Sequence, residues 1–153
     1  MVHIHHEGIA DAPVARTFEY VDDYRNTTEW MFGLSKFEPN TARLNGLDAT
    51  FDGTFAVKPI KLHSSIRITS WAQDSVIGFE SYQGFRIKSE WNFVALAAER
   101  STVVVDFYYE LPGGLAGRAM GRAMEPIVAL SIRHSDDALR KAVAASYRRQ
   151  QGI

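Results

Sequence analysis

The fold of this chain is decided by residues 103–117, which read VVVDFYYELPGGLAG. Side chains alternate between two faces from Val103 to Tyr109, as in a strand that buries one of its faces. Pro112-Gly113-Gly114 ends this strand, because proline lacks a backbone donor and glycine accepts positive φ angles. A helical pattern then runs nearly to the end of the chain. The strand and the helix are therefore expected to pack as neighbours around one core.

Composition limits the classes of protein that this chain can represent. The 153 residues fit a single domain over 1–153, and 46% of them are hydrophobic, enough for a substantial core. The 17 basic and 18 acidic residues nearly cancel, which argues against nucleic acid or an anionic membrane as the main partner. With no cysteine, the chain has no disulfide, thiol nucleophile or thiolate metal site.

The same sequence lacks the features of an inserted or exported protein. No apolar run approaches the roughly 20 residues that a membrane span needs. Residues 1–10 have neither the basic region nor the apolar region of a secretory signal. We therefore expect a soluble cytoplasmic protein without stable membrane insertion.

Strand and helix patterns alternate along the first two thirds of the chain. Residues 2–10 predict a strand, and two short helices follow at about 13–21 and 26–31. Period-two alternation then predicts strands at 51–57, 62–68, 77–79, 85–93 and 103–109. Connections are short, with Lys58-Pro59 and Gly84 among them, so an antiparallel meander is favoured over parallel crossovers.

The last third predicts one amphipathic helix of about 30 residues. At 100° per residue, one apolar face collects Met120, Met124, Ile127, Ser131, His134, Ala138, Ala142 and Ala145. The opposite, solvent-facing side collects Arg118, Arg122, Arg133, Asp136 and Arg140. Pro126 cannot donate its backbone hydrogen bond, so we expect a bend there.

These elements predict an α+β architecture. We expect a curved antiparallel sheet of about seven strands wrapped around the long C-terminal helix, with two short helices between strands one and two. Aromatic side chains fill the inward face of the sheet, while the facing helix is small and flexible. Such faces either interdigitate into a dry core or enclose a ligand cavity lined by aromatic and methionine side chains. Both interpretations stand at this point.

Three segments resemble one known superfamily. Residues 9–13, with Phe18 and residues 20–23, resemble the first strand and helix of the START-like superfamily, also called SRPBCC or helix-grip. Residues 25–30, RNTTEW, resemble its short second helix, which ends in tryptophan. Residues 109–115, YELPGGL, resemble its last junction between strand and helix. Within the superfamily, the chain is most similar to the group of polyketide cyclases/dehydrases and lipid transport proteins.

The resemblance implies a hydrophobic cavity between sheet and long helix that binds lipids, polyketides or similar molecules. It implies no single reaction, because relatives include carriers, ligand sensors and aromatase/cyclases. We therefore expect a single START-like domain that binds or transports a hydrophobic small molecule. The alternative is an enzyme of the polyketide aromatase/cyclase or dehydratase type, with His134, Tyr109 or Ser131 as proton carriers.

The expected ligand-binding residues come from the inward face of the sheet and the apolar face of the helix. They are Phe55, Ile66, Phe79, Ser89, Trp91, Phe93, Phe107, Tyr109, Met120, Met124, Ile127, Ser131 and His134. No set of side chains assembles into a catalytic triad, so no catalytic residue and no cofactor is expected.

A histidine cluster near the N-terminus is the other candidate site. His3 and His5 fall on one face of the first strand and would bind a metal ion with a third ligand. Apart from Glu7, no acidic or cysteine cluster nearby completes the set. We therefore expect these histidines, with His6, to be exposed strand residues rather than a metal site.

Overall fold

The computed structural model describes residues 1–57 and 60–152, so the Lys58-Pro59 connection lies outside the described residues. The sheet is built from seven strands: β1 (Val2–Ala10), β2 (Leu34–Pro39), β3 (Thr50–Val57), β4 (Ile60–Ala72), β5 (Val76–Gly84), β6 (Arg86–Ala97) and β7 (Arg100–Glu110). The helices are α1 (Val14–Asp22), the 3-10 helix η1 (Tyr24–Asn26), α2 (Thr27–Trp30) and α3 (Gly114–Gln150).

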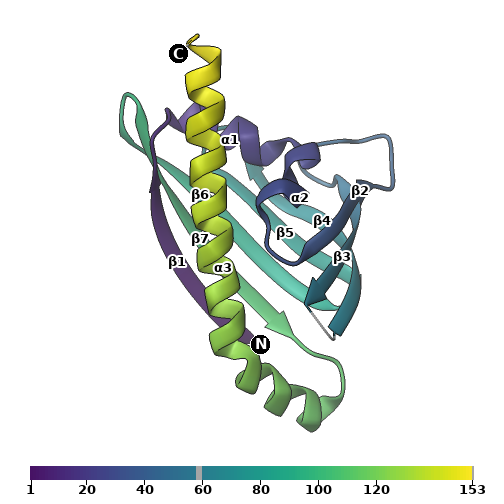
Figure 1. Cartoon of the computed structure of the whole chain (residues 1–153). Helices are drawn as coiled ribbons and strands as arrows, with labels where there is room; N and C mark the ends of the chain where they lie inside the picture. The colour runs from purple at the N-terminus through teal and green to yellow at the C-terminus, as the bar shows by residue number, and fades with distance from the viewer. Residues whose placement is uncertain (58–59, 153) are drawn as a thin grey trace.

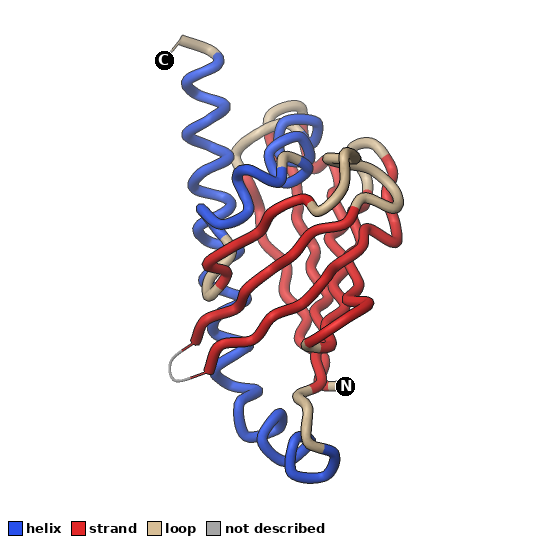
Figure 2. The backbone as a smooth tube through the Cα atoms, turned by 90° about the vertical axis from the view of Figure 1, so that its right-hand side faces the viewer, coloured by secondary structure: helices blue, strands red, loops and turns tan. Residues whose placement is uncertain are grey.

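All neighbouring strands run antiparallel in the order β1-β7-β6-β5-β4-β3-β2. The sheet curls around α3, which crosses β1 and β7 and continues past the end of the sheet (Figures 1 and 2). The predicted α+β helix-grip architecture is confirmed. Among the described residues, no helix is both long and apolar enough to cross a membrane.

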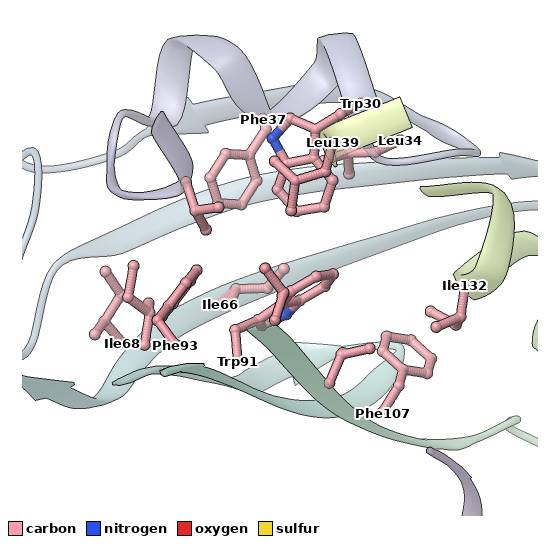
Figure 3. Packing of buried hydrophobic residues seen from close by; sticks show 14 of the residues in the cluster. Trp30, Leu34, Phe37, Ile66, Ile68, Trp91, Phe93, Phe107, Ile132 and Leu139 are labelled. Carbon is pink, nitrogen blue, oxygen red and sulfur yellow. The ribbon is translucent and has the colours of Figure 1, made fainter. Parts of the chain in front are cut away.

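Strict alternation builds the core on β6 and β7. Trp91 on β6 pairs with Val105 on β7, and both are fully buried. Two residues further along each strand, Phe93 and Phe107 are also buried. In Figure 3, Trp30 and Phe37 lie across the core from Trp91 and Ile66, while Ile132 from α3 approaches Phe107. The inward face of the sheet is therefore the one that the alternation predicts.

The short helices cover a large part of this face. Phe18 on α1 meets Trp71 and Phe93 edge to face, with ring centroids 5.6 and 5.4 Å away. Trp30 on α2 meets Trp91 in the same way at 5.1 Å. Three helices, and not α3 alone, thus cover the apolar side of the sheet. The space left for a cavity lies between α2, α3 and the strands.

The prediction of the inward face of α3 is wrong. The buried face is rotated about the helix axis relative to the predicted one. The buried residues of α3 are Gly117, Gly121, Ile132, Ser135, Asp136, Leu139 and Val143. Asp136 was expected in solvent and is fully buried, whereas Met120 and Ile127 are each 53% exposed. His134 is also exposed. The physical cause is a local network, in which Asp136 Oδ2 accepts hydrogen bonds from His6 Nε2 and Arg140 Nε, each at 2.9 Å.

Pro126 lies inside α3. In Figure 1, the green first turns of α3 leave the axis followed by its yellow part. Proline removes one backbone hydrogen bond and its ring crowds the preceding turn, which explains the bend. The hydroxyl of Tyr109 donates to the carbonyl of Gly121, 2.6 Å away, and so fastens the segment before the bend to β7.

Two glycines in this segment give a paired test of how closely α3 approaches the strand junction. A Cβ at Gly117 would lie 2.4 Å from the carbonyl oxygen of Pro112, whereas a Cβ at Gly121 would lie 3.7 Å from its nearest neighbours. Gly121→Ala is therefore expected to stabilise the protein by about 0.5–1 kcal/mol, the usual gain inside a helix. Gly117→Ala is expected to destabilise it by about 1–3 kcal/mol through overpacking. Chemical unfolding of both variants measures the difference, and a stabilising Gly117→Ala would contradict this packing.

Candidate ligand cavity

An apolar cavity lies between the sheet, the end of α2 and the middle of α3. Its volume is about 90 Å³. The lining consists of Met31, Phe32, Phe55, Leu62, Phe85, Phe107, Tyr109, Leu111, Met124, Ile127, Val128, Ser131, Ile132 and Ser135. Alternation on β3, β4 and β7 directs Phe55, Leu62, Phe107 and Tyr109 inward. The turns of α3 after Met124 close the opposite wall.

A second apolar cavity of about 40 Å³ continues deeper under α2. It shares Met31, Phe55 and Phe107 with the first cavity and adds Ile66, Phe79, Ser89 and Trp30 to the lining. Small-molecule pockets usually enclose about 300–1,000 Å³. The side chains here are therefore packed closely, and a ligand of lipid size has to displace some of them. Met31 and Met124 are suited to this because unbranched thioethers adopt many rotamers.

An open vestibule of about 610 Å³ leads from the surface to the first cavity. It lies between the Gly84 turn and the junction of β7 with α3. Leu62, Phe85 and Leu111 line both spaces, so they form the connection between them. The mouth is thus apolar, while Arg86 and Glu110 form an ion pair in the vestibule with 2.5 Å between Nη1 and Oε2.

A groove of about 600 Å³ on the outer side of the sheet has a different character. Its lining is polar and includes exposed Lys36, Lys61 and Gln83. Thr54 Oγ1 and His63 Nδ1 are hydrogen-bonded there at 3.0 Å, and Ser65 donates to Asp52 at 3.0 Å. No large apolar side chain is among the described residues that line this groove, so the inner cavity is the better candidate for the expected ligand.

The polar groups of the inner cavity are hydroxyls that already have partners. Tyr109 donates to Gly121 O, and Ser131 donates to Ile127 O at 2.9 Å. Ser135 donates to Ser131 O and accepts from the backbone N–H of Phe32, both at 2.8 Å. Burial raises the pKa of the Tyr109 hydroxyl above its ordinary value, so this group stays protonated at neutral pH.

The structure brings together most of the predicted ligand-binding residues. Phe55, Phe107, Tyr109, Met124, Ile127 and Ser131 line the first cavity, and Ile66, Phe79 and Ser89 line the second. Trp91 and Phe93 are buried in the core beside these spaces and do not line them. Met120 and His134 are exposed on α3, outside both linings.

Several lining residues are absent from the predicted set. Met31 and Phe32 follow α2, and Val128, Ile132 and Ser135 lie on the face of α3 that the helical projection missed. His134 touches the site only indirectly, since its ring meets the Phe32 ring edge to face at 5.3 Å. The sequence signal for the helical wall was present as Val128, Ile132, Leu139 and Val143, but the charge at Asp136 obscured it.

Comparison with known proteins gives one family. The profile of the family described as polyketide cyclase/dehydrase and lipid transport matches residues 1–145. None of the curated proteins matches the chain.

Solved structures share the fold at low sequence identity. A protein from Thermus thermophilus superposes with a TM-score of 0.81 at 18% identity, over 95% of this chain and 99% of that one. A START superfamily protein from Mycobacterium smegmatis superposes with a TM-score of 0.68 at 13% identity, over 97% of this chain and 98% of that one. The Zhui aromatase/cyclase from a Streptomyces species superposes with a TM-score of 0.70 at 19% identity, over 97% of this chain and 94% of that one.

Proposed function

Because the chain belongs to the polyketide cyclase/dehydrase and lipid transport family of START-like proteins, we propose that it binds a hydrophobic small molecule. The ligand is lipid- or polyketide-like and occupies the cavity between the sheet and α3. The observation that carries this proposal is the composition of the lining, in which apolar side chains of β3, β4 and β7 face apolar side chains of α3. Burial of apolar ligand surface contributes about 25 cal/mol per Å² there.

Ligand entry enlarges the cavity. The vestibule leads to Leu62, Phe85 and Leu111, and Met31 and Met124 line the cavity beyond it. Gly114, the first residue of α3, lines the vestibule, and Pro126 interrupts the helix twelve residues later. Rotation of Met31 and Met124, with a small movement of that helical segment, opens a path without breaking the sheet. Binding is therefore accompanied by a local rearrangement, and its free energy is the apolar gain less the cost of that rearrangement.

The chemistry of the lining supports binding more than catalysis. Among the described lining residues, the only titratable side chain is Tyr109, and burial keeps it protonated. Its hydroxyl is engaged with Gly121 O. A general base would have to reach the cavity from outside this set.

Filling the cavity is expected to weaken binding. Val128→Phe adds a ring to a part-buried position of the lining, and Leu130→Phe adds the same ring to a side chain that is 62% exposed on the same helix. Loss of about 55 Å² of apolar contact corresponds to about 1.4 kcal/mol, or tenfold in affinity. We expect Val128→Phe to weaken the binding of a fluorescent fatty acid at least tenfold and Leu130→Phe to leave it nearly unchanged. Equal affinities for both variants, at equal thermal stability, would contradict the location of the site.

The enzymatic alternative is tested with the same protein. A polyketide aromatase/cyclase or dehydratase needs a proton carrier next to the reactive chain, and Tyr109 is the lining residue suited to donate a proton. Turnover of a poly-β-keto thioester that is lost in Tyr109→Phe, while fatty-acid affinity is preserved, would favour the enzyme. Fatty-acid binding without turnover in the wild-type protein would favour the carrier.

A further inference from the structure

A cluster of two histidines and one aspartate lies on the outer face of the sheet. His3 and His5 are two residues apart on β1, so their side chains share a face. Asp106 on β7 is the register partner of His5. Its Oδ1 lies 2.8 Å from His3 Nε2 and 2.8 Å from His5 Nδ1. The three potential ligand atoms all lie within 4.8 Å of one another.

We propose that His3 Nε2, His5 Nδ1 and Asp106 form a binding site for a divalent transition metal ion, with Zn²⁺ as the reference ion. Imidazole nitrogens and carboxylate oxygens are the zinc ligands available to a chain without cysteine. Three protein ligands leave one tetrahedral position for water or another molecule. Bonds of about 2.0–2.2 Å place tetrahedral ligand atoms about 3.3 Å apart, so small side-chain rotations convert the hydrogen-bonded cluster into a coordination site.

Neighbouring side chains hold both imidazoles in the required orientation. The second nitrogen of His5, Nε2, lies 3.2 Å from Glu7 Oε1. When a metal ion displaces the proton that Nδ1 shares with Asp106, this contact holds the remaining proton on Nε2, which is the usual arrangement of a carboxylate behind a metal-bound histidine. The ring of His3 stacks on the Tyr108 ring, with centroids 4.3 Å apart and an interplanar angle of 7°. A pair of exposed histidines without such supports would rotate freely.

Two further carboxylates lie on the same face of the sheet. Glu7 adds a carboxylate on β1, and Glu90 on β6 is the register partner of Asp106 on its other side. The alternation that turns Trp91 and Phe107 inward turns Glu90 and Asp106 outward. The site is therefore separated from the ligand cavity by the sheet itself, and it does not depend on the proposed ligand.

Calorimetric titration of the untagged protein with ZnCl₂ tests the proposal. We expect one Zn²⁺ per chain in the wild type and, for each of His3→Ala, His5→Ala and Asp106→Asn, affinity reduced by at least about tenfold. Glu7→Gln should weaken binding about 10–100-fold, the usual effect of removing a carboxylate behind a histidine ligand. His63→Ala, an exposed histidine on β4, is the matched control and should bind like the wild type.

Cobalt(II) supplies an independent readout, because a tetrahedral site with nitrogen ligands gives visible absorption bands that free cobalt lacks. These bands should appear with the wild type and His63→Ala and disappear with His5→Ala. Circular dichroism of each variant confirms that the sheet is intact. Absence of stoichiometric zinc binding in the wild type would overturn the proposal. The proposal would also be overturned if His63→Ala weakened zinc binding as much as the ligand variants do. It would likewise be overturned if His5→Ala and Asp106→Asn both bound zinc as tightly as the wild type.

Discussion

Replacing Trp91 with alanine is expected to lower the free energy of unfolding by about 3–5 kcal/mol, the range for truncating a large aromatic side chain in a core. Trp91 is fully buried on β6, a strand held between β5 and β7. Its ring meets the Trp30 ring edge to face, with centroids 5.1 Å apart. Alanine therefore leaves a cavity and removes one of the contacts between α2 and the sheet.

Two further variants make this experiment specific. Val94→Ala, at a neighbouring strand position that is 54% exposed, should change stability by less than about 0.5 kcal/mol. Trp91→Phe should cost less than Trp91→Ala, because it keeps a ring against Trp30 and removes an indole N–H that no described residue accepts. Urea unfolding followed by circular dichroism measures all three. Equal midpoints for Trp91→Ala and Val94→Ala would mean that the faces of β6 are assigned the wrong way round.

The faces of β6 and β7 were predictable because alternation is a local property of the sequence. Neighbouring side chains point to opposite sides whatever the strand pairs with, so Trp91, Phe93 and Phe107 could be placed without knowledge of the topology. β2 shows where this reasoning ends. Its pairing shifts between Leu34 and Lys36, so the buried residues Leu34 and Phe37 are three apart and no period-two pattern identifies the strand.

Sites whose residues come from different strands could not be predicted from the sequence for a related reason. The candidate metal cluster joins β1 to β7, and its two parts are about 100 residues apart in the chain. The sequence presents His3 and His5 together but gives no sign that Asp106 lies beside them. The first half of that cluster was visible, and the pairing that completes it is a tertiary property.

The prediction of which α3 residues form the helical wall of the ligand cavity was partly wrong for an energetic reason. A projection of α3 assigns every charged residue to solvent, because burying an unpaired charge costs several kcal/mol. Asp136 reduces this cost through the hydrogen bonds that its Oδ2 accepts from His6 and Arg140, whereas its buried Oδ1 has no partner among the described residues. Its burial turns Ile132 and Leu139 inward and leaves Met120 and His134 outside. Sequence reasoning therefore predicted the inward faces of the strands, while it predicted the inward face of α3 only in part.

The second large effect is expected at Gly8, which lies beside the buried network of Asp136, His6 and Arg140. Gly8→Ala should lower the free energy of unfolding by about 3–5 kcal/mol, the usual cost of disrupting a buried ion pair. An added Cβ at Gly8 would lie 2.2 Å from Asp136 Oδ2 and 2.6 Å from Arg140 Nε. Arg140 can move toward solvent, since its side chain is 28% exposed, but Asp136 is fully buried between α3 and β1. The carboxylate would then lose its hydrogen bond from Arg140 while remaining in the core.

A double-mutant cycle separates this mechanism from a general distortion of β1. In the background Asp136→Ala the carboxylate is absent and Arg140 is free to move away, so Gly8→Ala should cost less than about 1 kcal/mol there. A coupling of about 2 kcal/mol or more between the two positions is expected, which is within the range for residues in direct contact. Unfolding of the two single variants and the double variant in urea, with the wild type, supplies the four free energies. If Gly8→Ala cost the same in both backgrounds, the close approach of β1 to Asp136 would not be what keeps glycine at this position.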